Sequence, residues 1–97
     1  MWIIKIGGSW IKNPNLKRLV LLTSSFFREK FVIVPGGGIF ADSVREASKY
    51  NISEQTGHFL ALKATEIFGY LIKSMNSNLH LTANLDNFRE KNLWMPS

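Results

Sequence analysis

Cysteine is absent from this 97-residue sequence. That absence excludes a disulfide framework, a thiolate metal site and a thiol nucleophile. Apolar runs of the roughly 18–20 residues that a transmembrane helix requires are absent as well. The first residues show no basic segment followed by a cleavable apolar stretch, which is the pattern of a secretory signal peptide. We therefore expect a protein of the cytoplasm that does not associate with a membrane.

Dense clusters of positive charge are also missing, although the net charge is +5 and the pI is about 9.8. The 12 lysines and arginines are scattered along the chain, without the interleaved aromatic residues of a nucleic-acid-binding module. A net positive charge of this size is also compatible with phosphorylated ligands, or with a surface that is charged only for solubility. We therefore expect phosphorylated small molecules as ligands rather than nucleic acid.

The content of hydrophobic residues, 45%, and of aromatic residues, 12%, is that of a globular protein. Residues 1–97 are expected to form one small domain. A chain of this length buries a modest core, so association with a partner or with a second copy would add to its stability.

Four apolar runs predict strands. Residues 2–6 and 31–34 are continuous, rich in β-branched residues and followed by glycines, as in strands buried on both faces of a parallel sheet. Residues 79–82 and 93–95 are weaker candidates. Strands that alternate with helical segments indicate an α/β fold, here a parallel sheet with helices on both faces in three α/β/α layers and right-handed crossovers.

Helical periodicity appears in three segments between these runs. Residues 13–27 begin with an Asn-Pro pair, residue types that suit an N-cap and the first helical position. Residues 40–51 carry a shorter stripe, and residues 53–75 carry the most regular amphipathic pattern of the chain. That stripe consists of Leu60, Ala64, Ile67, Phe68, Leu71, Ile72 and Met75. Residues 84–91 are expected to form a short fourth helix.

The first glycine loop, Gly7-Gly8-Ser9, follows the first strand directly. Glycines at the carboxyl end of a strand let the backbone approach a ligand, and their N–H groups can bind phosphate oxygens. Lys5 is unexpected in an otherwise apolar strand, and a bound phosphate would supply its counter-charge. The alternative is an ordinary turn, with Lys5 extended into solvent.

The second glycine loop, Gly36-Gly37-Gly38, also lies between a strand and a helix. Three consecutive glycines are entropically costly to order, which suggests that side chains there would block a ligand or a neighbouring loop. A flexible turn is the alternative. Neither loop has the Walker A pattern or the dinucleotide-binding G-x-G-x-x-G pattern. Loops on neighbouring parallel strands would face each other at one edge of the sheet, where such sheets bind ligands.

Three segments, 5–9, 34–38 and 40–45, together resemble the amino-acid kinase superfamily, which includes aspartate, acetylglutamate and uridylate kinases. The chain is most similar to the branch that phosphorylates the (aminomethyl)furanmethyl phosphate precursor of methanofuran. The run P-G-G-G-x-F-A-D-x-V-R, His58 and the late Trp94-x-Pro96 suit that branch. The resemblance extends over nearly the whole chain and implies its N-terminal, phosphate-binding half.

For the first loop, the resemblance implies nucleotide binding. Lys5 would be the catalytic residue that neutralises the transferring phosphoryl group. Gly7, Gly8 and Ser9 would hold the phosphates of ATP.

For the second loop and the helix after it, the resemblance implies binding of the acceptor. Gly36, Gly37 and Gly38 would cradle the acceptor and the phosphate that passes to it. Asp42 and Arg45 would contact the acceptor, since an arginine fork suits a phosphorylated or carboxylated molecule. An ion pair between these two residues on the surface of the helix is the alternative.

The function that follows is transfer of the γ-phosphoryl group of ATP, with Mg²⁺, to a small phosphorylated or carboxylated acceptor. Phosphoryl transfer depends on positioning and on stabilisation of spreading charge, and no metal ligand is assigned to this chain. Members of the superfamily are longer, and their second half supplies the adenine site, a further lysine and an aspartate. We therefore expect activity together with a C-terminal partner. The alternative is a non-catalytic phosphate-ligand-binding or dimerisation module, with residues 53–75 as a contact in a homo-oligomer.

Overall fold

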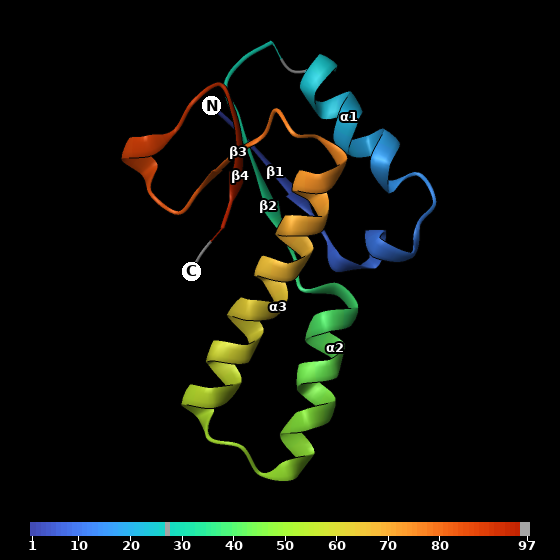
Figure 1. The fold of residues 1–97 in the computed structure, drawn as a ribbon, viewed down its shortest axis with the longest axis vertical. Helices are drawn as coiled ribbons and strands as arrows, with labels where there is room; N and C mark the ends of the chain where they lie inside the picture. The colour runs from blue at the N-terminus through green and yellow to red at the C-terminus, as the bar shows by residue number, and fades with distance from the viewer. Residues whose placement is uncertain (27, 96–97) are drawn as a thin grey trace.

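The computed structural model describes residues 1–26 and 28–95, and the side chain of Phe26 is left out. Four parallel strands form one sheet in the order β1-β2-β4-β3 (Figure 1). The strands are β1 (Trp2–Ile6), β2 (Phe31–Pro35), β3 (His80–Thr82) and β4 (Lys91–Trp94). The expected parallel α/β class is thus confirmed.

Three α-helices and three short 3-10 helices connect the strands. The α-helices are α1 (Leu16–Phe26), α2 (Gly38–Ala47) and α3 (Glu54–Met75), and the 3-10 helices are η1 (Gly8–Lys12), η2 (Ser48–Tyr50) and η3 (Leu85–Asn87). None of the helices in the described part of the chain is both long enough and apolar enough to span a lipid bilayer.

The hydrophobic core lies between one face of the sheet and the helices α1 and α3. Alternate residues of the strands point to this face, so Phe31 and Ile33 of β2 are fully buried. The buried cluster consists of Ile6, Leu16, Val20, Phe31, Ile33, Phe68, Ile72, Leu79 and Leu93. Within α3 the stripe predicted from the sequence supplies Phe68 and Ile72, whereas Ile67 is exposed.

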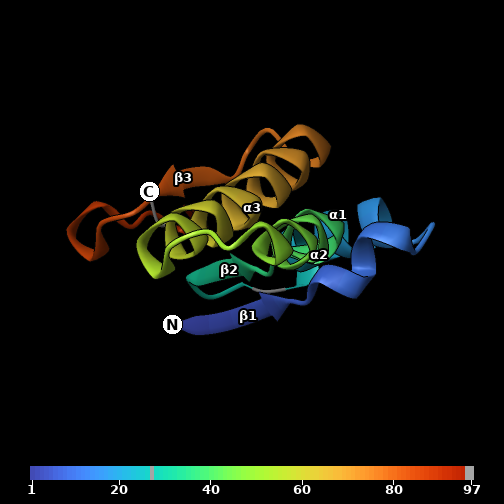
Figure 2. The same ribbon diagram turned by 90° about the horizontal axis from the view of Figure 1, so that it is seen from below.

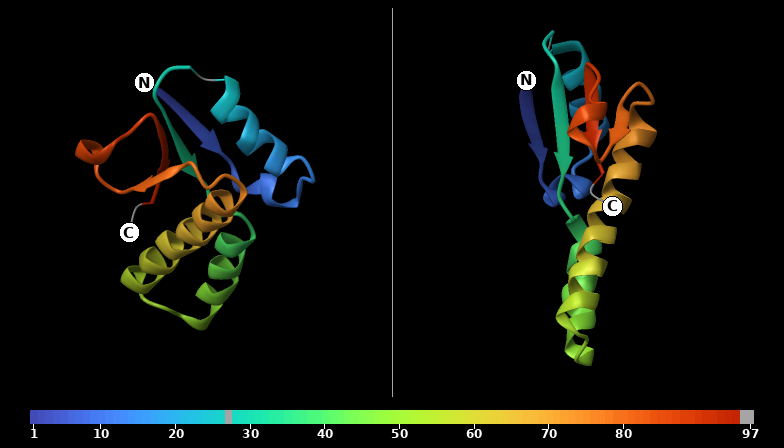
Figure 3. Two further views of the ribbon diagram at one scale, coloured as in Figure 1. Left: turned by 45° about the horizontal axis from the view of Figure 1, so that its top comes forward. Right: turned by 90° about the vertical axis from the view of Figure 1, so that its left-hand side faces the viewer.

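The strand order explains which face each connection covers. The steps from β1 to β2 and from β2 to β3 run in the same direction across the sheet, so right-handed crossovers place α1 and α3 on the same face. The step from β3 back to β4 runs in the opposite direction and places η3 on the other face (Figures 2 and 3). There, Leu85 and Phe88 lie beside Val32 and Val34. In the described residues, one face therefore carries the helices and the other carries η3.

Helices α2 and α3 form a hairpin that projects beyond the carboxyl ends of β1 and β2 (Figure 1). Asn51, with φ of 59°, follows η2 in the left-handed conformation, which asparagine tolerates better than most residues. The Ser53 hydroxyl oxygen then accepts a hydrogen bond from the Thr56 N–H at 3.1 Å and caps α3. The predicted start of the third helix near Ser53 is confirmed. The second helix was predicted to end near Asn51; α2 itself ends at Ala47, and the 3-10 turn η2 continues the helical backbone to Tyr50.

One expectation about the helices was wrong. Residues 84–91 form no α-helix: η3 is a single turn at Leu85–Asn87 that the Asn84 side chain caps through the Asp86 N–H, and Lys91 already belongs to β4. The regular part of α1 begins at Leu16, two residues after the Asn-Pro pair, and the Asn13 side chain accepts a hydrogen bond from the Asn15 N–H at 2.9 Å, as an N-cap residue does. Phe27 and Pro96 lie outside the described residues.

Candidate functional site

The two glycine loops contact each other at the carboxyl ends of β1 and β2, as predicted. The Gly36 N–H donates to the Ile6 carbonyl at 2.9 Å and continues the pairing of the strands into the loops. A Cβ atom on Gly8 would lie 2.1 Å from the Gly38 nitrogen, which leaves no room for any side chain. Glycine is therefore required at residue 8 by the packing of one loop on the other.

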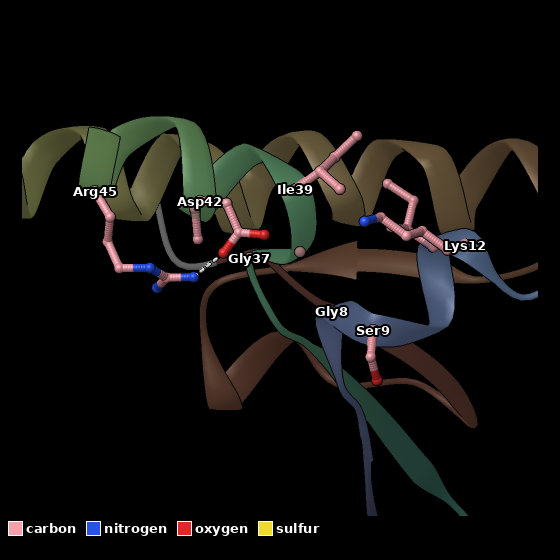
Figure 4. A pocket seen from close by; sticks show the side chains of 10 residues that line it. Gly8, Ser9, Lys12, Gly37, Ile39, Asp42 and Arg45 are labelled. Carbon is pink, nitrogen blue, oxygen red and sulfur yellow. Dashed lines mark hydrogen bonds and ion pairs between the residues drawn. The ribbon is translucent and has the colours of Figure 1, made fainter. Parts of the chain in front are cut away.

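A cleft of about 470 Å³ opens beside this contact, between η1 and the first turns of α2 (Figure 4). Its lining combines backbone of both loops with polar and apolar side chains. The lining residues are Gly8, Ser9, Ile11, Lys12, Gly37, Gly38, Ile39, Ala41, Asp42 and Arg45.

The N-terminus of α2 forms one wall of this cleft. Gly38 has φ of +60°, and no side chain caps the helix at Gly37. The first N–H groups of a helix have no partners within the helix, and they carry the positive end of its dipole. The first turn of α2 contains no acidic residue. This wall is therefore suited to bind an anion.

Two basic side chains and one acidic side chain complete the cleft. Arg45 forms an ion pair with Asp42, and these side chains are 71% and 64% exposed. The surface ion pair that the sequence left as an alternative is thus present, and both members also line the cleft. Exposed pairs of this kind contribute about 0–1 kcal/mol, so an anionic ligand can compete for Arg45.

Lys12 is the basic residue that reasoning from the sequence missed. It is exposed, lies in the last turn of η1 and extends toward the α2 side of the cleft (Figure 4). The hydrogen bonds and ion pairs of the described residues give its ammonium group no partner. Its position three residues after Ser9 would have indicated the site only if a 3-10 turn after the first glycine loop had been expected.

Not every predicted site residue lines the cleft. Gly8, Ser9, Gly37, Gly38, Asp42 and Arg45 do, whereas Lys5, Gly7 and Gly36 do not. The Ser9 hydroxyl points away from α2 (Figure 4).

Lys5 has an exposed side chain in β1, opposite Val34 in the register. His58 is exposed on α3, outside the lining of the cleft. Among the residues described, no group of three or more histidine, aspartate or glutamate side chains is arranged to hold a metal ion. The chemical capacity of the site is therefore anion binding by backbone N–H groups and by two cations.

Known proteins to which this chain is similar include two kinases. No family model matches the chain. In sequence it is similar to [5-(aminomethyl)furan-3-yl]methyl phosphate kinase of Methanocaldococcus jannaschii, at 43% identity over 75 residues. That match covers 71% of this chain and 33% of the relative.

In fold the chain is similar to the crystal structure of uridylate kinase from Archaeoglobus fulgidus, with a TM-score of 0.72 and 17% sequence identity. The match covers 96% of this chain and 49% of that structure, so the chain spans about half the length of this protein. Both similar proteins are kinases by name. The resemblance to the amino-acid kinase superfamily, and within it to the (aminomethyl)furanmethyl phosphate kinase branch, is therefore confirmed.

Proposed function

We propose that this chain provides the phosphate- and acceptor-binding part of an ATP-dependent phosphotransferase. The observation that carries the proposal is the cleft itself, where two glycine loops, the uncapped N-terminus of α2 and the cations Lys12 and Arg45 converge. Phosphoryl transfer needs such groups, because catalysis consists largely of positioning and of stabilising negative charge.

On this proposal the first loop and η1 bind the phosphates of ATP. Gly7, Gly8 and Ser9 supply backbone N–H groups, and the Lys12 ammonium balances charge on the phosphate oxygens. Mg²⁺ binds mainly through phosphates, carboxylates and water. The described lining of the cleft contributes only the carboxylate of Asp42, so the metal would arrive with ATP. ATP supplies the phosphoryl group, and the chain's own residues hold and orient it.

The second loop and α2 bind the acceptor. The N–H groups of Gly37 and Gly38 face the transferred phosphate, and Arg45 exchanges part of its contact with Asp42 for an anionic group of the acceptor. The N–H of Gly36 bonds the Ile6 carbonyl, so Gly36 contributes to this cradle through its lack of a side chain next to Gly8. A small phosphorylated or carboxylated molecule fits these groups. The name of the M. jannaschii relative points to an aminomethylfuran phosphate as the first acceptor to test.

Lys5 would neutralise the charge of the transferring phosphoryl group, as the resemblance to the superfamily implies. Its side chain is exposed at the end of β1, one residue before the buried Ile6, and its long stem allows the ammonium to move toward a bound phosphate. Replacement of Lys5 by methionine is expected to lower transfer more than it lowers the affinity for ATP.

Completion of the active site by a C-terminal partner is part of the proposal. In the described part of the chain, β1 lies at an edge of the sheet, and Ile3 on this strand is 70% exposed. An open strand edge next to exposed apolar side chains is a surface on which a further part of a fold can pack. That part would supply the adenine pocket.

The test is reconstitution of phosphoryl transfer. The chain is combined, as a fusion and as separate pieces, with the part of the M. jannaschii kinase that lies beyond the aligned region. ADP formation from Mg-ATP is then measured with the aminomethylfuran phosphate acceptor. We expect activity that falls about tenfold or more with Lys12→Met, because a charge-assisted contact is lost. Lys17→Met, on the exposed surface of α1, is the matched control and should retain activity.

Binding of Mg-ATP without transfer in every combination would instead identify a non-catalytic phosphate-ligand-binding module. Absence of Mg-ATP binding by a folded chain would contradict the proposal as a whole.

A further inference from the structure

A second cavity of about 470 Å³ lies at the opposite end of the sheet, beside the amino ends of β3 and β4 and the carboxyl end of α3. It shares no lining residue with the glycine cleft. Because all four strands are parallel, the glycine cleft lies at the carboxyl ends of the strands and the second cavity lies at their amino ends.

Basic side chains dominate this second cavity. Lys73, His80, Arg89 and Lys91 line it, against the single carboxylate of Glu90. No ion pair joins any of them in the described residues, so Arg89 and Lys91 have no anionic partner there. Cations gathered from α3, β3 and β4 around one hollow raise the local positive potential, which a bound anion would relieve.

The backbone at Arg89 is held by the side-chain amide of Asn92. Asn92 is 0% exposed; its Oδ1 accepts from the Arg89 N–H at 2.7 Å. Its Nδ2 donates to the carbonyls of Arg89 at 2.7 Å and Phe31 at 2.9 Å. Both backbone polar groups of Arg89 are therefore fixed to the centre of the sheet. A rigid backbone lowers the entropic cost of presenting this arginine to a ligand.

Two further side chains, Lys73 and His80, hold the rest of the rim through three hydrogen bonds. Lys73 Nζ donates to the carbonyls of Ser77 and Leu79, which ties the end of α3 to the segment before β3. His80 Nε2 donates to the Asn87 carbonyl at 3.0 Å, since a carbonyl can only accept. Three segments of the rim are thus connected to one another around the hollow.

We propose that this second cavity is a binding site for a small anion that carries phosphate or carboxylate groups, separate from the glycine cleft. Arg89 and Lys91 supply the charge, while Lys73 and His80 hold the rim through their bonds to backbone carbonyls. A ligand bound here would contact the ends of α3, β3 and β4 without occupying the cleft. The proposal is independent of the proposed function.

The test follows the amide signals of the ¹⁵N-labelled chain by NMR during titration with sodium pyrophosphate, and separately with citrate, at constant ionic strength. We expect a saturable set of shifts around residues 78–81 and 89–91. In the double variant Arg89→Gln/Lys91→Gln the affinity for this set should fall about tenfold or more, because two charge-assisted contacts are lost. Lys17→Gln/Arg18→Gln on α1 is a matched control with the same change in net charge.

Shifts with pyrophosphate alone assign the site to phosphate groups, and shifts with citrate alone assign it to carboxylates. Absence of saturable shifts with both anions, or equal affinity in the Arg89→Gln/Lys91→Gln variant and the wild type, would overturn the proposal. Binding in the glycine cleft is followed separately, through the amide signals of Gly8, Gly37 and Gly38. A loss of binding at one site can therefore be distinguished from a loss of binding at the other.

Discussion

At the scale of single residues, two neighbouring glycines of the first loop have different reasons to be there. Gly8 is in contact with the backbone of Gly38, whereas a Cβ atom on Gly7 would meet no atom within 4 Å. Gly7 also has φ of −66° and ψ of 153°, a conformation that any residue adopts. The structure therefore requires glycine at residue 8 but not at residue 7, which also lies outside the lining of the cleft.

The variants Gly8→Ala and Gly7→Ala should accordingly differ in stability. Gly8→Ala forces the two loops apart and should lower the free energy of unfolding by about 1–3 kcal/mol. Gly7→Ala should be neutral, or stabilising by about 0.4–1 kcal/mol, since it restricts the unfolded chain without strain in the folded one. Urea denaturation followed by circular dichroism measures both. Equal stability of the two variants would show that the loops do not pack as described.

Asn92 is a fully buried polar residue whose side chain makes three hydrogen bonds. Asn92→Ala removes these bonds to the buried carbonyl of Phe31 and to the part-buried N–H and carbonyl of Arg89. We expect a loss of about 1–3 kcal/mol in the free energy of unfolding. Asn87→Ala, at an exposed asparagine of η3, is the control and should change it by less than about 0.5 kcal/mol. A neutral Asn92→Ala would mean that the turn before β4 is held by other contacts.

At the scale of elements, α3 connects the core to the projecting hairpin. One of its faces packs on the sheet through Phe68 and Ile72, while Phe59, nearer its N-terminus, is 56% exposed. The two phenylalanines have the same side chain on the same helix and differ mainly in burial.

This difference predicts contrasting effects of truncation. Phe68→Ala should cost about 3–5 kcal/mol, because it removes a fully buried ring and leaves a cavity. Phe59→Ala should cost less than about 1 kcal/mol, mainly through its contact with the Lys63 ammonium, 5.4 Å from the ring centroid. Thermal unfolding of the two variants under the same conditions compares them directly. A similar loss in both would contradict the assignment of the core face of α3.

The elements also show what could be predicted from the sequence. The first two strands and α3 were predictable because their signals are local: β-branched runs that end at glycines, a continuous apolar stripe, and Ser53 at the N-cap. The absence of a helix at residues 84–91 was not predictable, because the segment before β4 is held by Asn92, which bonds the backbone of Arg89 and the distant carbonyl of Phe31. Lys12 was missed for a related reason, since a 3-10 helix has no apolar periodicity that would reveal η1.

At the scale of the whole molecule, the strand order determines where ligands can bind. The position of β4 between β2 and β3 could not be predicted from local patterns, because it depends on long-range pairing. That order leaves the carboxyl ends of β1 and β2 adjacent, and with them the two glycine loops. The pairing of the loops was predictable from the parallel β-α-β pattern, whereas the cleft between η1 and α2 required the structure.

The most direct test of the central claim is an NMR titration of the ¹⁵N-labelled chain with Mg-ATP, monitored at the amides of Gly8, Gly37 and Gly38. We expect saturable shifts at these three amides, an affinity about tenfold lower in Lys12→Met, and unchanged affinity in Lys17→Met. Unchanged glycine amides at saturating Mg-ATP, in a chain whose spectrum shows it to be folded, would contradict the account of this cleft as a phosphate-binding site.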